Sequence, residues 1–205
     1  MSRISGWALT AVLFASALLI IGGSARAADD IEQKAQLCAT CHGADGVPIN
    51  NTTPVIWGQA EGYLYLQLRD FQKGTRKSPL MEPIVADLER QDMYDLAAYF
   101  TKKKWPNLGQ PSAPSDVAAK AESAAKSIGC RGCHLDRFQG DGTTARLAGQ
   151  WQEYLLSQML AFRDGSRGNN PGMSDLMKAT APDDIASLSQ YLAGLQIDAY
   201  LGSGR

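Results

Sequence analysis

Two short segments of this chain place cysteine and histidine side chains at a spacing that suits covalent haem attachment. The pattern Cys-x-x-Cys-His occurs at 38–42 and again at 130–134, and the two copies contain every cysteine and every histidine of the chain. Two thiols three positions apart can bond to the vinyl groups of one haem, and the adjacent imidazole can then bind its iron. The pattern therefore predicts two haem c groups. The residues predicted to bind them are Cys38, Cys41, His42, Cys130, Cys133 and His134.

Other uses of paired cysteines are two disulfides, a zinc site or a thioredoxin-like redox pair. A tetrahedral zinc site could use both pairs, but residues 44–129 between them form almost a whole repeat unit rather than a zinc ribbon. A thioredoxin-like pair needs a βαβ context, and the pattern of this chain does not indicate one. Haem attachment is the favoured interpretation.

Methionine is the expected second axial ligand of each iron. A haem that only passes electrons needs two axial ligands, and the chain has no third histidine to supply one. Only Met81 and Met173 occupy matching places in the two motif-containing halves, and each follows a proline-containing stretch. Met177 is the alternative ligand in the second half. Met93 and Met159 are expected to fill the core, which is the usual role of methionine.

The sequence after the N-terminal segment is an internal duplication. The step from histidine to predicted methionine ligand is 39 residues in each half. A Gly-Gln pair at 58–59 recurs at 149–150, and a tyrosine follows it at the same distance in both copies. Two units of one kind are therefore expected, with one haem in each.

Helices are expected to position these residues. Apolar side chains recur with helical periodicity, and no stretch alternates with a period of two, so the predicted fold is all-α. The predicted helices are 61–71, 90–102, 116–128, 152–162 and 182–195. Both predicted methionine ligands are placed in loops. Thr180 followed by Asp183 resembles a capping box at the start of the last helix.

Pro54 could orient the first imidazole, because its carbonyl lies 12 residues after His42 and could accept the ring N–H. The other interpretation of Pro54 is an ordinary turn residue. The second half has Ala145 or Arg146 near the equivalent place, which predicts that the second haem is held differently.

Several other side chains repeat or cluster without a single clear role. Arg76 and Arg167 occupy matching positions and could pair with haem propionates, or could be ordinary surface arginines. Three lysines at 102–104 are expected to favour a helix C-terminus, with a docking patch for an acidic redox partner as the alternative. The bulky aromatics expected to line the haem crevices are Trp57, Tyr63, Trp151 and Tyr154.

The N-terminus predicts export. Arg3 precedes an apolar run at 7–21, and Ala25-Arg26-Ala27 fits a small-x-small cleavage site. We expect a signal peptide at 1–27, cut near Ala27 or Ala28, and the alternative is an uncleaved membrane anchor. Export of a haem c protein predicts a periplasmic location. Because the net charge is −1, the chain has no broad basic field for nucleic acid.

Prolines and glycine between the two halves predict a semi-stiff linker at 106–115. The predicted domains are then 28–105 and 116–205, each large enough for one small helical core.

Taken together, these motifs resemble the cytochrome c4 family. The resemblance is carried by the two Cys-x-x-Cys-His motifs, the arginine-containing loops before the two methionines, and two further repeated patterns. These are Gly-Gln-x-x-x-Tyr at 58–63 and 149–154, and Asp-x-x-x-Leu-x-x-Tyr at 92–99 and 184–191. The likeness covers essentially the whole chain after the predicted signal peptide.

The resemblance implies two tandem class I cytochrome c domains related by a pseudo-twofold axis. It implies His42 and Met81 on one iron, and His134 and Met173 on the other. It also implies a periplasmic electron carrier, soluble or loosely held at the membrane. The chain departs from the family in lacking a second-half equivalent of Pro54.

The function expected from all of this is a diheme electron carrier rather than an enzyme. Its expected partners are redox proteins, for example a membrane quinol–cytochrome c reductase and a terminal oxidase. The alternative is the cytochrome subunit of a periplasmic dehydrogenase that oxidises sulfide, thiosulfate or an alcohol. A catalytic diheme peroxidase is disfavoured because no spare histidine exists.

Overall fold

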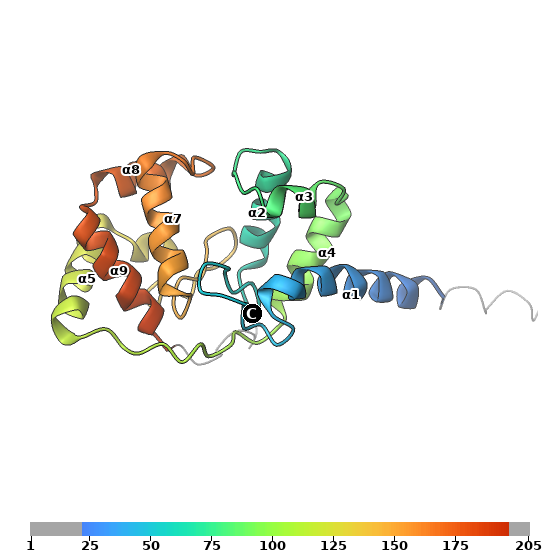
Figure 1. The fold of residues 1–205 in the computed structure, drawn as a ribbon, viewed down its shortest axis with the longest axis horizontal. Coiled ribbons are helices and arrows are strands. Elements are labelled where there is room, and N and C mark those ends of the chain that lie inside the picture. The colour runs from blue at the N-terminus through green and yellow to red at the C-terminus, as the bar shows by residue number, and fades with distance from the viewer. Residues whose placement is uncertain (1–21, 197–205) are drawn as a thin grey trace, which may run out of the picture.

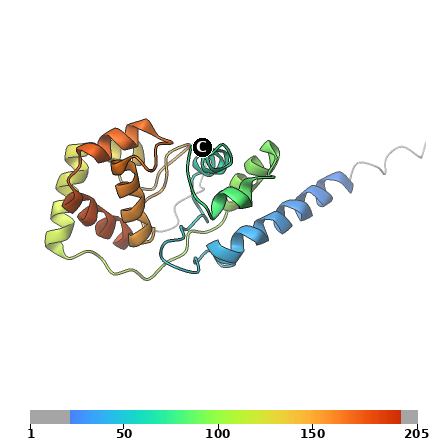
Figure 2. The ribbon, with the colours of Figure 1, turned by 45° about the horizontal axis from the view of Figure 1, so that its top comes forward.

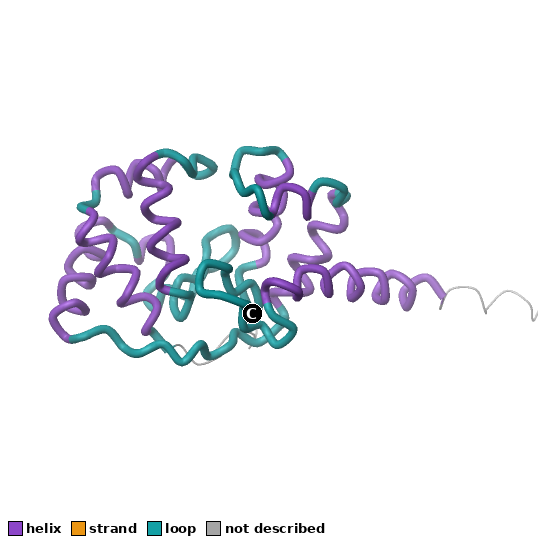
Figure 3. The backbone as a smooth tube through the Cα atoms, viewed as in Figure 1, coloured by secondary structure: helices purple, strands orange, loops and turns teal. Residues whose placement is uncertain are grey.

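The structure is a computed structural model that describes residues 22–196, with side chains from Asp30 onward. Most of the predicted signal peptide lies outside the described residues, and its last residues fall in the first helix. The described part of the chain is helical and contains no strand, apart from one isolated bridge between Asp141 and Thr144 (Figure 3). None of the helices described has the length and apolar character needed to cross a membrane.

The first half is built from four helices, α1 (Gly22–His42), α2 (Glu61–Gln72), α3 (Met81–Val85) and α4 (Arg90–Thr101). α4 packs against both α1 and α2, and α3 packs against α2. Their shared core is small. Its fully buried members are Ala35, Leu64, Leu96, Ala97 and Phe100.

The second half contains α5 (Ser115–Ile128), α6 (Arg131–His134), α7 (Gln152–Asp164), α8 (Pro171–Ala179) and α9 (Pro182–Gly194). α9 packs against α5 and α7, and α8 covers α7. This core is larger than that of the first half, and its members with 2 % exposure or less include Phe138, Met177, Ile185, Leu188 and Leu192.

The two halves lie side by side, joined by a stretch at 104–114 that forms no helix. This connection passes along one side of the molecule, while α2 and α7 occupy the inner side of each half (Figures 1 and 2). Arg76, in the loop after α2, donates to Tyr154 of α7, and Arg167, in the loop after α7, donates to Gln67 of α2, so these helices and the loops that follow them form the surface between the halves.

The predicted long helices agree with the structure to within one or two residues, but two local predictions are wrong. Both predicted methionine ligands lie in short helices, Met81 at the start of α3 and Met173 in the first turn of α8. The expected capping box at Thr180 does not form, because its hydroxyl donates to the Leu176 carbonyl at 2.8 Å. A capping box forms instead at the start of α4, between Glu89 and Asp92.

The repeated glycine of each Gly-Gln pair is required by the backbone. Gly58 and Gly149 have φ values of 65° and 74°, in the left-handed region that favours glycine. Each donates its N–H to the last turn of the closing helix of its own half, to the Phe100 carbonyl at 2.8 Å and the Leu192 carbonyl at 2.9 Å. This turn fixes the direction in which the following glutamine points.

Candidate haem sites and the surface between them

The first Cys-x-x-Cys-His motif forms the last turn of α1. Cys38 is half-buried against the core of the first half, and Cys41 is exposed. Burial raises the pKa of the Cys38 thiol to about 11. Both cysteines are free thiols on one helical turn, followed directly by His42, so the donor set fits covalent haem attachment.

The second motif repeats this arrangement, with Cys130 as the N-cap of α6 and residues 131–134 forming the whole helix. Cys130 is half-buried against the second core and Cys133 is exposed. Burial also raises the pKa of Cys130. Among residues 22–196 no cluster of three or more His, Cys, Asp or Glu side chains is arranged to hold a metal ion.

Each histidine is buried and oriented by a main-chain carbonyl. The Nδ1 of His42 lies 2.7 Å from the Pro54 carbonyl, and that of His134 lies 2.8 Å from the Ala145 carbonyl. Because a carbonyl only accepts, the proton must be on Nδ1, which leaves the Nε2 lone pair free for a metal. Burial lowers the pKa of both imidazoles, so they stay neutral at physiological pH. Both rings are therefore prepared to bind haem iron.

The expectation that the missing second-half proline would change this contact is wrong. Ala145 lies 11 residues after His134 and Pro54 lies 12 after His42, yet both supply the same acceptor atom. The contact involves only a main-chain carbonyl, so the side chain of the residue that supplies this carbonyl does not affect it.

The methionines divide into core residues and partly exposed ones. Met93 and Met159 are buried with 3 % and 9 % exposure, which confirms their predicted core role. Met177 is also taken up by the second core, with 2 % exposure. Met81 and Met173 are only partly buried, and Met173 lies at the edge of that core.

Arg76 is buried and reaches across to the other half. Its guanidinium stacks over the ring of Phe71, with Cζ 4.5 Å from the ring centre. Its Nη2 donates to the Tyr154 hydroxyl at 2.9 Å and to Gln158 Oε1 at 2.8 Å, both on α7. Its Nη1 donates to Gln67 Oε1 of its own half at 2.8 Å.

Arg167 makes the mirror set of contacts. It stacks over Phe162 at 4.3 Å and donates from Nη1 to Gln158 at 2.8 Å. Its Nη2 donates to Tyr63 at 3.3 Å and to Gln67 at 3.0 Å, both on α2. All matching residues are 91 positions apart, and each arginine makes equivalent contacts to the other half, so the two sets are related by an approximate local twofold axis. The glutamines were not predicted, although their repeat at this offset could have indicated them.

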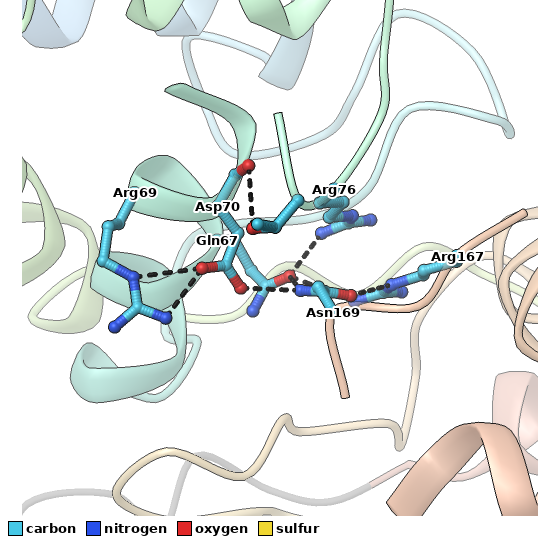
Figure 4. Close-up of polar contacts among 7 residues, drawn as sticks. Gln67, Arg69, Asp70, Arg76, Arg167 and Asn169 are labelled. Atoms are coloured by element: carbon cyan, nitrogen blue, oxygen red, sulfur yellow. Dashed lines mark hydrogen bonds and ion pairs between the residues drawn. The ribbon is translucent and has the colours of Figure 1, made fainter. Parts of the chain in front are cut away.

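A buried carboxylate lies near this arginine pair but does not neutralise it (Figure 4). Asp70 pairs with Arg69 at 2.7 Å and accepts a hydrogen bond from Asn169 at 2.8 Å. Arg167 donates from Nε to Asn169 Oδ1 at 3.1 Å rather than to this carboxylate. The other hydrogen-bond acceptors of Arg76 and Arg167 are neutral amide and phenol oxygens.

Arg76 and Arg167 therefore form no ion pair with a carboxylate in the described part of the chain. Burial alone would raise the pKa of the Tyr63 phenol, but the cations Arg167 and Arg76 lower it below its usual value. The alternative of ordinary surface arginines is wrong, because both are more than nine-tenths buried. A pair of buried cations favours an anionic group nearby.

The remaining repeated residues have mainly structural contacts. The hydroxyls of Tyr63 and Tyr154 belong to the arginine network, and Trp57 packs against the first core. Lys103 lies over the ring of Tyr99 at 4.0 Å, which fits packing at the end of α4.

Comparisons with known proteins agree with this geometry. No family profile matches the chain. Cytochrome c4 of Pseudomonas aeruginosa is 34 % identical over 198 residues, covering 89 % of this chain and 98 % of the relative. The thiosulfate dehydrogenase electron acceptor of Stutzerimonas stutzeri is 32 % identical over 208 residues, covering 92 % of this chain and 94 % of the relative.

A solved structure shows the same fold. The crystal structure of reduced recombinant cytochrome c4 from Pseudomonas stutzeri superposes with a TM-score of 0.73 at 30 % identity, covering 82 % of this chain and 98 % of that one. The sequence identity, the shared fold and the two oriented histidines all indicate the same family. The chain belongs to the cytochrome c4 family of diheme, haem c-containing electron carriers.

Proposed function

We propose that this chain shuttles single electrons in the periplasm between respiratory redox partners. The observation that carries the proposal is the matched pair of buried, neutral histidines, each with Nδ1 held by a carbonyl. Bound haem would supply the one-electron couple of its iron. The residues around it keep the ligands in place, so little rearrangement accompanies each transfer.

In this proposal the thiols of each motif would hold one haem covalently, and His42 and His134 would bind its iron through Nε2. Met81 and Met173 would be the second protein ligands of the irons, and a thioether ligand would favour reduced iron and raise the reduction potential. Met173 is preferred over Met177 because Met177 is already enclosed by the second core. Releasing a fully buried methionine would leave a cavity.

Arg76 and Arg167 are proposed to pair with haem propionates. Buried cations whose acceptors are neutral gain most from an anion, and a guanidinium binds a carboxylate through two parallel bonds. The repeated position of the two arginines gives each half one such cation beside the other half's helix.

The export route and the domain boundaries belong to the same proposal. We place cleavage of a signal peptide near Ala27 or Ala28, a linker at 106–115, and domains at 28–105 and 116–205. The absence of helix at 104–114 supports a linker in this region. A quinol–cytochrome c reductase and a terminal oxidase are the partners proposed for the free carrier.

A second candidate function is electron acceptor of a thiosulfate dehydrogenase. It is favoured by the relative of that name, which matches nearly the full length of this chain. The iron ligands would be the same, but the electrons would come from one dedicated enzyme.

The ligands are tested by expressing the protein with haem-attachment machinery and comparing wild type with Met81→Leu, Met173→Leu and Met177→Leu. We expect two attached haems by mass, and a reduced wild-type protein that does not bind carbon monoxide. The first two variants should each lose one methionine–iron absorption signal and bind carbon monoxide at one haem, whereas Met177→Leu should not. Carbon monoxide binding to wild type would contradict the proposed ligation.

The two candidate functions differ in their electron donor. Stopped-flow mixing of the oxidised protein with a thiosulfate dehydrogenase and thiosulfate should give fast reduction only if the second candidate is correct. Fast reduction by a quinol–cytochrome c reductase alone would favour the free carrier.

A further inference from the structure

Each half of the molecule holds a main-chain segment of the other half through one glutamine side chain. Gln150 Oε1 accepts the Val55 N–H at 2.9 Å, and its Nε2 donates to the Val55 carbonyl at 3.0 Å. Gln59 makes the same two bonds to Arg146, at 2.6 Å and 3.0 Å. Both glutamines are at most 3 % exposed, so neither set of bonds competes with water.

The peptide groups that these glutamines hold are the ones that orient the histidines. The peptide unit between Pro54 and Val55 uses its C=O to accept the His42 Nδ1–H, and its N–H to donate to Gln150. Two hydrogen bonds of 2.7 Å and 2.9 Å therefore connect the imidazole to a side chain of the other half through one planar peptide group.

The second histidine has the same connection in the opposite direction. The peptide unit between Ala145 and Arg146 accepts the His134 Nδ1–H at 2.8 Å and donates its own N–H to Gln59 at 2.6 Å. The arrangement is thus exchanged between the halves. Neither half completes the hydrogen-bond chain of its own histidine.

Hydrogen bonds in such a chain strengthen one another. An acceptor on the peptide N–H draws electron density toward the carbonyl oxygen, which then accepts the imidazole N–H more strongly. A stronger bond at Nδ1 makes the Nε2 atom a more basic ligand. A more basic ligand stabilises the oxidised iron and lowers its reduction potential.

We propose that Gln150 is a positioning residue for His42 and Gln59 is one for His134, so that each half adjusts the reduction potential of the haem bound by the other. This inference rests on the proposed histidine ligation. It adds a direct physical link between the two haem sites that does not depend on either haem group touching the other.

The test uses the intact two-haem protein and follows each haem separately. Proton NMR during a redox titration reports the axial-methionine methyl group of each haem, and Met81→Leu assigns the pair by removing one resonance. Gln150→Met keeps the size of the side chain but removes the acceptor for Val55. We expect the haem at His42 to become about tenfold easier to reduce, a shift of about 59 mV for a one-electron couple, with the haem at His134 much less affected.

Three matched variants complete the design. Gln59→Met should shift the haem at His134 instead. Gln150→Glu keeps an oxygen acceptor for the Val55 N–H, so the potential should stay at or below the wild-type value. Gln110→Met removes a neighbouring amide that also holds main-chain atoms, including the Gln150 carbonyl at 2.9 Å, and it should shift neither haem.

A purely structural role for the glutamines predicts a different result. Equal shifts of both haems, a shift only in the haem of the mutated half, or no shift would each overturn the proposal. The proposal would also be overturned if the reduction potential of the haem at His42 rose as far in Gln150→Glu as in Gln150→Met. If Gln150→Met does not yield a two-haem protein, Gln59→Met carries the same test. A wild type with fewer than two haems, or no resonance lost in Met81→Leu, would instead refute the proposed ligation.

Discussion

Replacing Gly62 by alanine should destabilise the contact between the halves. Gly62 is the second residue of α2 and lies against the loop at 141–144 of the other half. A methyl group added at Gly62 would come within 2.8 Å of the Gly142 carbonyl oxygen and 3.1 Å of its carbon. The same carbonyl accepts the Tyr63 N–H at 3.0 Å, so the clash and the hydrogen bond involve one atom.

The size of the effect follows from these distances. To reach an ordinary contact of 3.4 Å, the loop must withdraw by about 0.6 Å, which would stretch the Tyr63 hydrogen bond to about 3.6 Å and break it. Overpacking costs about 1–3 kcal/mol and the lost bond about 1 kcal/mol. Better helix propensity returns at most about 1 kcal/mol. The net loss is about 2 kcal/mol.

Thermal and urea unfolding of the two-haem protein provide the assay, followed both by helical circular dichroism and by haem absorbance. For a protein of this length the expected loss lowers Tm by about 4–8 °C. The matched control is Gly172→Ala, also at the second residue of a helix, where the new methyl group meets only Asn170 Oδ1 at 3.5 Å. The control should be neutral or slightly stabilising. A Gly62→Ala protein as stable as this control would refute the reasoning.

Two further predictions concern the helices that carry the proposed iron ligands. Lys34 donates to Asp92 at 2.6 Å and so ties α1 to α4; this bond is the main cause that lowers the pKa of the Asp92 carboxyl. The stabilisation is therefore complete above the unfolded pKa of about 4 and is lost as pH falls through the lowered value, so acid titration should loosen α1 in wild type but show no such step in Lys34→Met. Arg163 donates to three carbonyls at the end of α8, at 2.6–3.1 Å. Arg163→Met should cost about 2 kcal/mol and weaken the methionine–iron signal of Met173 at elevated temperature, and a signal that melts as in wild type would contradict this.

The sequence predicts long helices well and short ones poorly, for a physical reason. A helix of 12 residues shows its apolar stripe over three turns, as α4 does. α3 has five residues and α8 has nine, too few for a pattern that stands out from a loop. Side chains from other helices stabilise both: Gln72 donates to carbonyls at and just after the end of α3, and Arg163 donates to a carbonyl at the end of α8. Tertiary contacts, rather than local propensity, account for these two helices.

The candidate sites also divide into features that local sequence predicts and features that depend on tertiary contacts. The motif residues and the carbonyl of Pro54 were predictable, because short-range spacing fixes them. The contacts of Gln59 and Gln150 were not, since they join residues 87 and 95 positions apart and cross between the halves. The duplication predicts that a contact occurs twice. It does not predict whether the contacted residue lies in the same copy or in the other copy.

The exchange of these contacts follows from the duplication itself. Two copies of one unit that meet through the same surface form a self-complementary interface, so any side chain that reaches across does so twice. We therefore expect one residue type to act at both proposed haem sites, so that losing either glutamine affects the site in the other half. Where the copies have diverged, the symmetry fails: Asp70 corresponds to Ala161, and Gly62 meets a loop that its counterpart Glu153 does not repeat. These positions distinguish the two halves, and we expect a difference between the two reduction potentials to originate at such positions.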